Sequence, residues 1–259
     1  MFEHNINPII FQVGMFQLTY YALVYLIGFI AALLILLNAA KKKEINLRIK
    51  DVYLFMALAI LGIIIGARAF HIIFWDFEFF SRYPAEIPKI WRGGLSFHGG
   101  LLGAILISIL FTKWKKVNFW ILADTFALLG ILMPVFSRIV NFINQEIVGT
   151  ITDIPWCFKF KFHDGCRHPV QLYAAVGRLA FFSALLIIKR KIKTYRHGFL
   201  FWMSLTGVAI GRFFLDFWRE DIRYVFLSVG QWFSLIILII GTYALYFYYK
   251  DDIRKLTRG

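Results

Sequence analysis

Residues 16–50 read FQLTYYALVYLIGFIAALLILLNAA-KKKEINLRIK, an apolar run without a single charge that ends in a basic stretch. The apolar part, Phe16–Ala40, is longer than the roughly 20 residues that a helix needs to cross a bilayer. Lysine and arginine gather on the cytoplasmic side of membrane helices, so residues 41–50 are expected to face the cytoplasm. The segment therefore predicts a membrane helix that begins on the outer side.

The same alternation of apolar runs and basic connections continues along the whole chain. Of the 259 residues, 60% are hydrophobic, whereas a soluble domain is closer to half apolar. We expect an all-α polytopic membrane protein with about seven transmembrane helices in a single domain, residues 1–259. The expected spans are Phe16–Ala40, Asp51–Trp75, Leu95–Thr112, Phe119–Ser137, Pro169–Ile188, Gly198–Trp218 and Gly230–Tyr249.

The formal net charge of +14 is distributed in a way that argues against nucleic acid as a partner. The basic residues lie in short connections between the apolar runs, at 41–50, 113–116 and 189–196, and after residue 249. Alternate connections of a seven-helix chain fall on one side of the membrane, and the positive-inside rule makes that side cytoplasmic. The N-terminus is then expected outside and the C-terminus in the cytoplasm.

Three external connections remain, and they hold the unusual residues. Residues 76–94 combine aromatic and charged side chains, so this segment is either an interfacial arm in the headgroup layer or an ordinary ordered loop. Residues 138–168 are expected to form an outer-face segment with functional groups. Residues 219–229 make the third connection.

Arg138 and Asn141 stand three residues apart at the outer end of the apolar run that begins at Phe119. Positions three apart share one face of a helix, so both side chains point the same way. A guanidinium beside an amide suits a phosphate oxyanion, and an ionisable residue in a membrane helix is a functional candidate. The alternative is a structural arginine whose charge reaches the membrane surface.

A second polar stripe lies at the end of the sixth expected span. Arg212, Asp216 and Arg219 stand at i, i+4 and i+7, so they share a helix face. Together with Arg138 they could form a cationic pocket that is open to the outer leaflet. The alternative is a set of buried ion pairs that only fixes helix packing. Arg68 and Arg178 are further basic residues within spans, and we expect them to be structural.

His98 enters the third expected span within the sequence SFHGG. It could transfer a proton, because an unperturbed imidazole titrates near neutral pH, or it could bond to a neighbouring helix. Cys157 and Cys166 are the only cysteines, and an oxidising exterior permits a disulfide between them. A zinc site with His163 and His168 is disfavoured, because the spacing matches no standard zinc motif.

Four motifs resemble those of the bacterial prolipoprotein diacylglyceryl transferases in order and spacing, across about residues 7–249. They are YYALVYLIGF at 20–29, GGLSFHGG at 93–100, RIVNFINQE at 138–146 and RHPVQLY at 167–173. The resemblance implies that the diacylglyceryl group of phosphatidylglycerol passes to the lipobox cysteine of a preprolipoprotein signal peptide. A thioether forms and glycerol phosphate leaves. It also implies a transferase without metal or other cofactor, surrounded by lipids of the bacterial inner membrane, with its active site near the outer leaflet.

The resemblance assigns roles to individual residues. It implies that phosphatidylglycerol is bound by Arg138, Gly149 and Arg219. It implies a catalytic set of Tyr21, His98, Asn141, Glu146, Arg212 and Asp216, with His98 as a candidate base. Such residues suit the reaction, because arginines stabilise the departing phosphate and a thiol needs a base or a positive field to become a thiolate.

Alternatives stay open beside this function. The chain could be a divergent relative with an altered substrate, or a lipid- or anion-translocating protein that uses the same cationic cavity. It could also be a structural membrane protein. A translocator should show inverted repeats or broken helices, for which the sequence gives no convincing sign. A structural protein would not need so many charged residues near one membrane face.

Overall fold

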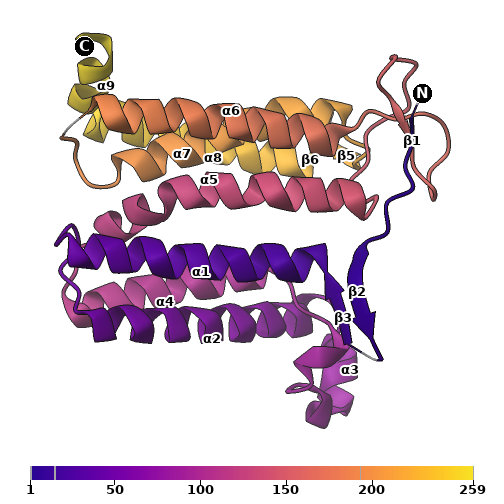
Figure 1. Ribbon diagram of the computed structural model, residues 1–259, viewed down its shortest axis with the longest axis horizontal. Helices are drawn as coiled ribbons and strands as arrows, with labels where there is room; N and C mark the ends of the chain where they lie inside the picture. Colours follow the sequence, from indigo (N-terminus) through magenta and orange to yellow (C-terminus); the bar gives the residue numbers. More distant parts are fainter. Residues whose placement is uncertain (1, 15, 193, 259) are drawn as a thin grey trace. The chain divides into compact units, whose positions relative to one another are not determined.

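Long apolar helices make up most of the computed structural model, which describes residues 2–14, 16–192 and 194–258 (Figure 1). Six helices in this part of the chain are long and apolar enough to cross a membrane. They are α1 (Tyr20–Lys41), α2 (Ile49–Phe74), α4 (Phe97–Lys115), α5 (Phe119–Ile143), α6 (Val170–Lys191) and α8 (Val229–Tyr248). The structure therefore confirms the predicted all-α membrane class.

The predicted span Gly198–Trp218 contains a shorter apolar helix, α7. This helix covers Phe199–Leu215 and has 17 residues. A 3₁₀ turn, η3 (Asp216–Trp218), continues it directly. The count of seven spans and the outside position of the N-terminus stay predictions.

The first helix begins later than predicted. Strand β3 occupies Phe16–Thr19 and pairs antiparallel with β2, Ile9–Val13, so α1 starts at Tyr20. The Thr19 hydroxyl accepts a hydrogen bond from the Ala22 amide at 3.3 Å, which is the contact of a helix N-cap. The predicted span thus includes residues 16–19, which in the structure form one strand of a hairpin that precedes the helix.

Helix α5 is longer than the predicted span Phe119–Ser137 and continues to Ile143, although Pro134 lies within it. Arg138 and Asn141 therefore stand on its last turns. On these turns Arg138 Nη1 donates a hydrogen bond to Asn141 Oδ1 at 3.1 Å. Each polar group thus finds a partner at the end of an apolar helix. The outer-face position of residues 138–168 stays a prediction.

The chain divides into two compact units. The smaller consists of Leu33–Thr125 and includes α2, α4 and the connection between them. The larger joins Met1–Ala32 to Phe126–Gly259. The expectation of a single domain over residues 1–259 stays a prediction.

In the smaller unit, α2 and α4 pack closely because glycines face each other. A Cβ at Gly66 would clash with the Gly99 carbonyl and would approach Gly103 Cα to 3.0 Å. Contact between small residues is a common basis of helix association in membranes. The glycines that follow His98 therefore serve helix packing within this unit.

Arg68 of α2 holds the connection between α2 and α4. Its guanidinium donates to the carbonyls of Glu86 (2.7 Å), Ile87 (2.9 Å), Gly93 (2.8 Å) and Gly94 (3.1 Å). The connection contains α3 (Phe77–Arg82), η1 (Pro84–Glu86) and η2 (Ile90–Arg92). These contacts agree with the structural role predicted for Arg68. An interfacial position of residues 76–94 stays a prediction.

In the larger unit, α7 packs against both α6 and α8 (Figure 1). The connection between α5 and α6 is closed by a disulfide between Cys157 and Cys166. It also contains β4 (Phe158–Lys159), which pairs parallel with β1 (Phe2–Glu3). The remaining elements are the hairpin strands β5 (Arg223–Tyr224) and β6 (Leu227–Ser228), and the helix α9 (Lys250–Arg258).

Candidate functional site

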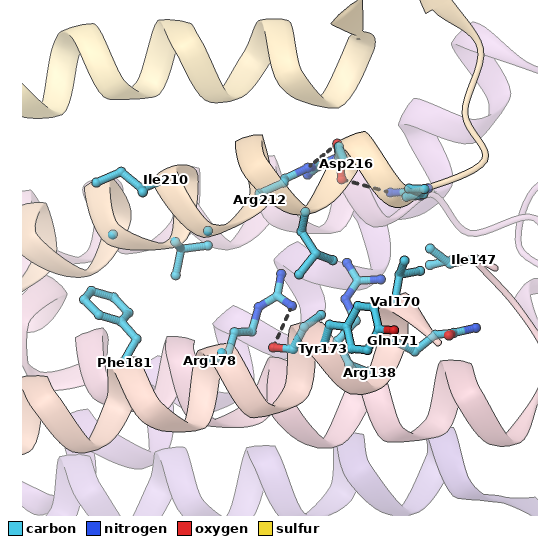
Figure 2. Close-up of a pocket in the computed structure, with 17 residues that line it drawn as sticks. Arg138, Ile147, Val170, Gln171, Tyr173, Arg178, Phe181, Ile210, Arg212 and Asp216 are labelled. Carbon is cyan, nitrogen blue, oxygen red and sulfur yellow. Dashed lines mark hydrogen bonds and ion pairs between the residues drawn. The ribbon is translucent and has the colours of Figure 1, made fainter. Parts of the chain in front are cut away.

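A cavity of about 220 Å³ in the larger unit is lined mainly by α6 and α7 (Figure 2). Four arginines and one aspartate line it: Arg138, Arg178, Arg212, Arg219 and Asp216. The remaining lining is largely apolar and includes Gly177, Phe181, Gly207, Val208, Ile210 and Gly211. The cavity thus joins a cationic part to an apolar part, as an amphiphilic anion requires.

A hydrogen-bonded network lies on the α5 side of the site. Asn141 accepts from Arg138 through its Oδ1 (3.1 Å), and its Nδ2 donates to the Tyr21 hydroxyl and to Glu146 Oε2 (2.9 Å). The Tyr21 hydroxyl in turn donates to Glu146 Oε2 at 2.7 Å. The structure therefore brings Tyr21, Arg138, Asn141 and Glu146 together, as a set of site residues should be.

A tight turn after α5 presents the Glu146 carboxylate to this network. The Glu146 amide donates to the Asn141 carbonyl at 2.9 Å, and its own carbonyl accepts from Gln171 Nε2 at 2.8 Å. The flanking residues Gln145 and Ile147 both have left-handed backbones, with φ of +59° and +57°. Such backbones are costly for residues other than glycine and concentrate at functional sites.

Asp216 is the buried centre of the second polar cluster and is only 3% exposed. Its carboxylate lies 3.7 Å from Arg212 Nε and 4.0 Å from Arg219 Nη1, and it accepts from the Ser228 hydroxyl at 3.2 Å. A Cβ at Gly230 would clash with the Asp216 carboxylate and meet Arg212 Nη2 at 2.7 Å. Glycine at position 230 therefore leaves the space that this ion-pair cluster occupies.

Arg219 has a second carboxylate partner in Asp221, with 3.0 Å between Nε and Oδ2. Burial raises the pKa of the Asp221 carboxyl, and the charge of Arg219 opposes that rise. The arginine is thus held by two carboxylates, which fixes its direction. The helical stripe predicted from i, i+4 and i+7 spacing is present, although Arg219 follows the end of η3 and is extended.

Gly149 contacts the site through its main chain. It forms a bridge with Arg219, its amide donates to the His168 carbonyl at 3.2 Å, and its carbonyl accepts from Arg167 Nη1 at 3.1 Å. A Cβ at this position would press on the His168 and Trp218 carbonyls. Gly149 is not among the described residues that line the cavity, and it contacts the segment of Arg219 through the main-chain bridge.

Arg178 lines the cavity, although sequence reasoning assigned it a structural role. It stands four residues after Ala174 and seven after Gln171, and both of these also line the cavity. The sequence contained a usable signal, because Arg178 is the single charge in α6 before its basic last turn. An ionisable residue in the middle of an apolar helix is a functional candidate.

The structure places His98 in the smaller unit, at the beginning of α4. Its side chain is exposed, and its ring stacks on Phe70 with 6.2 Å between ring centroids. The other predicted site residues all belong to the larger unit. The role of His98 as a base therefore stays a prediction that rests on its motif.

The two cysteines are bonded to each other, with 5.5 Å between their Cα atoms. This pairing matches the disulfide that the oxidising exterior permits, and it takes both thiols away from a zinc site. In the described residues no group of three or more histidines, cysteines and carboxylates is placed to hold a metal ion.

Comparison with known proteins gives one consistent result. The sequence model of a family described as prolipoprotein diacylglyceryl transferase matches residues 8–247. A phosphatidylglycerol–prolipoprotein diacylglyceryl transferase of Geobacter sulfurreducens is 34% identical over 245 residues, which cover 92% of this chain and 93% of the relative. The enzyme of the same name from Legionella pneumophila strain Lens is 36% identical over 248 residues, with 92% and 95% covered. That of Tolumonas auensis is 33% identical over 256 residues, with 96% and 98% covered.

Proposed function

This chain belongs to the prolipoprotein diacylglyceryl transferase family, and we propose on that basis that it transfers the diacylglyceryl group of phosphatidylglycerol to a prolipoprotein. It is a multi-pass inner-membrane protein, since its apolar helices and its family both indicate this. The observation that carries the proposal is the cavity itself. It places arginines beside an apolar lining, as a lipid with a phosphate headgroup requires.

The acceptor in this proposal is the thiol of the lipobox cysteine. The sulfur attacks the glyceryl carbon that bears the phosphate ester, and a carbon–sulfur bond forms as the carbon–oxygen bond breaks. Glycerol phosphate leaves with the bonding electron pair, and the thiol proton passes to a base. The products are a thioether-linked diacylglyceryl peptide and glycerol phosphate.

Arg138, Arg212 and Arg219 are proposed to hold the phosphate during this displacement. All three line the cavity. In the described chain, Asp216 neutralises part of the charge of Arg212 and Arg219, and Asp221 neutralises part of the charge of Arg219. Negative charge grows on the leaving oxygen as its bond to carbon breaks. Positive groups that are already in place stabilise this charge more in the transition state than in the bound lipid.

Glu146 and Tyr21 are proposed to act on the thiol side of the reaction. The Glu146 carboxylate accepts hydrogen bonds from Tyr21 and Asn141, so its position in the network is fixed. A held carboxylate can accept a proton directly or through the tyrosine hydroxyl. His98 is the other candidate base, on the strength of its motif.

Reconstitution tests this function directly. Purified protein in liposomes is given phosphatidylglycerol labelled in its acyl chains and a lipobox peptide, and the peptide mass is followed. We expect the peptide to gain one diacylglyceryl group and free glycerol phosphate to appear in equal amount. A peptide with serine in place of its lipobox cysteine is the matched control. Movement of labelled lipid between leaflets with no lipid on the peptide would instead support translocation.

The site is proposed to open toward the outer leaflet, where secreted prolipoproteins arrive. The support is the alternation of basic connections, which puts residues 41–50, 113–116 and 189–196 on the cytoplasmic side. A reporter fused after Lys250 should be cytoplasmic, and one within Asp153–Gly165 should be external. Finding both on one side contradicts this orientation.

A further inference from the structure

The arginines that hold this protein together are recognisable by their partners. Arg68 donates to four main-chain carbonyls and lies over the Phe80 ring at 4.5 Å. Arg167 donates to the Asp164 and Gly149 carbonyls and forms a 2.7 Å ion pair with Glu220. In both residues the guanidinium donors are hydrogen-bonded to groups of the protein itself, as expected for buried structural charges.

Arg178 is different, because the fold leaves most of its guanidinium unused. Its only hydrogen bond in the described chain runs from Nη1 to the Ala174 carbonyl, one turn earlier on α6, and is long at 3.5 Å. No carboxylate in this part of the chain lies within ion-pair distance of it. A charged group in an apolar helix with so few partners costs free energy unless a bound ligand supplies the missing contacts.

The charges around Arg178 point to the kind of ligand. The cavity has four arginines and one aspartate, and the Asp216 oxygens are already shared by Arg212, Arg219 and Ser228. Arg138 has an amide partner, Asn141, and no carboxylate of the described chain lies within ion-pair distance of it. The cavity therefore has positive charge left over at Arg138 and Arg178, and only an anion from outside the fold can balance it.

The surroundings of Arg178 show how such an anion is oriented. In Figure 2 its guanidinium points into the cavity, with Arg138 on one side and with Phe181 and Ile210 on the other. The apolar lining next to it includes Gly177 and Gly211, where an added Cβ would meet nothing within 4 Å. A ligand with an anionic head and a hydrocarbon tail can thus bind with its head at the arginines and its tail along the apolar lining.

We propose that Arg178 is a further substrate-binding residue, which with Arg138 holds the phosphate of phosphatidylglycerol while an acyl chain lies along Phe181. The assignment rests on the proposed function and deepens it. Two guanidinium groups on different helices, α5 and α6, contact the phosphodiester from two sides. Arg178 then serves mainly to bind and position the lipid before the bond to carbon breaks.

Kinetics with varied lipid test this assignment. Transfer to a lipobox peptide is measured in mixed micelles with increasing phosphatidylglycerol for the unmodified protein, Arg178→Gln, Arg178→Lys and Arg190→Gln. Arg190 is exposed in the last turn of the same helix and does not line the cavity, so its variant loses the same charge elsewhere. We expect Arg178→Gln to raise the KM for lipid roughly 10- to 100-fold with little change in kcat, as for a lost charge-assisted contact. Lysine should restore part of the affinity, and Arg190→Gln should change nothing.

Direct binding separates this assignment from the proposed function. Each variant, without peptide, is passed through gel filtration in lipid-free detergent, and the retained phosphatidylglycerol is measured. Loss of retention in Arg178→Gln supports the assignment even if the unmodified protein transfers nothing, in which case only the proposed function fails. Unchanged retention together with an unchanged KM overturns it. Arg178-dependent binding of inorganic phosphate with unaltered lipid retention assigns the site to free phosphate and overturns it as well.

Discussion

The Tyr21 hydroxyl donates a 2.7 Å hydrogen bond to Glu146, a residue 125 positions later in the chain. Asn141 donates to the same carboxylate oxygen at 2.9 Å and also bonds to the tyrosine hydroxyl. One carboxylate oxygen thus ties the start of α1 to the end of α5. Because each of the three groups has two partners within the network, loss of any one should disturb the other two.

Tyr21→Phe should lower the transfer rate by roughly one to two decades, because Glu146 loses one of its donors and is held less firmly by those that remain. The protein should still fold, since the ring remains. The matched control is Tyr25→Phe, one turn along α1, whose ring stacks on Tyr21 at 6.2 Å but is 56% exposed. Initial rates at saturating lipid measure the effect. Equal rates for Tyr21→Phe and Tyr25→Phe would show that the network is not part of the reaction.

Arg138→Gln should lose about 2–4 kcal/mol of transition-state stabilisation, or roughly two to three decades in rate. Arg138→Lys should be nearly as impaired, because lysine keeps the charge but not the planar fork. The amount of folded protein should stay near normal in both.

Arg68→Gln is the contrasting variant and should act on folding instead. It removes a guanidinium that binds four main-chain carbonyls, so the yield of folded protein should fall more than the rate per folded molecule. Fluorescence-detected gel filtration gives the yield and transfer assays give the rate. An Arg138→Gln protein with the unmodified rate would mean that the phosphate is bound elsewhere.

Local spacing was sufficient for part of this site. Positions three and four apart on a helix correctly placed Arg138 beside Asn141 and Arg212 beside Asp216. Hydropathy likewise gave the helical membrane class. It misplaced the start of α1, because the strand Phe16–Thr19 carries no charge and directly adjoins the apolar run of the helix. It also misplaced the end of α5, because Arg138 and Asn141 lower the apolar average although the helix continues through them.

Contacts between residues far apart in the sequence could not be predicted from residue spacing. The meeting of Tyr21 and Glu146 depends on how α1 lies against α5, and only the family resemblance placed both residues in one site. The substrate-binding role of Gly149 stays a prediction, and its main-chain contacts are ones that no residue pattern reveals. Arg178 looked structural because the sequence does not show whether a buried charge has partners. In the described chain it has one long hydrogen bond, whereas the Arg68 guanidinium donates to four carbonyls.

Gly211→Leu should block the apolar part of the cavity. An added Cβ meets nothing within 4 Å there, so the side chain can grow into the space without displacing the fold, and leucine is the better helix former. We expect the KM for phosphatidylglycerol with long acyl chains to rise at least tenfold, and that for short-chain lipid to change less.

Gly130→Leu is the matched control for this filling experiment. Gly130 is exposed on α5, has equally open surroundings and does not line the cavity. Its variant should keep the normal KM for both lipids. Should Gly211→Leu bind long-chain lipid as well as Gly130→Leu does, the acyl chain must lie outside this cavity.

Acid should loosen the N-terminal segment from the connection between α5 and α6. His4 is buried against Phe142 and Phe160, and burial lowers its pKa below the ordinary value of 6.5. The detached segment therefore binds protons more readily, so docking is favoured above about pH 6.5 and weakens as the pH falls below it. Hydrogen exchange of the Phe2 and His4 amides, corrected for intrinsic rates, should accelerate between pH 7.5 and 5. His4→Phe should remove this acceleration, and its persistence in that variant would assign the effect to another group.

Gly149→Ala should impair the reaction through Arg219 without touching the substrate. The added methyl group would press on the His168 and Trp218 carbonyls, so the bridge that holds the Arg219 segment must shift. Overpacking of this kind costs about 1–3 kcal/mol, and we expect a rate loss of roughly tenfold or more because a displaced guanidinium contributes less to the transition state. Gly130→Ala adds the same methyl group in open surroundings and should keep full activity.

A double-mutant cycle with Arg219→Gln tests whether the effect of Gly149→Ala is transmitted through Arg219. If Gly149 acts through Arg219, its substitution costs little once the arginine is gone, whereas fully additive losses would mean that Gly149 acts on the substrate by itself.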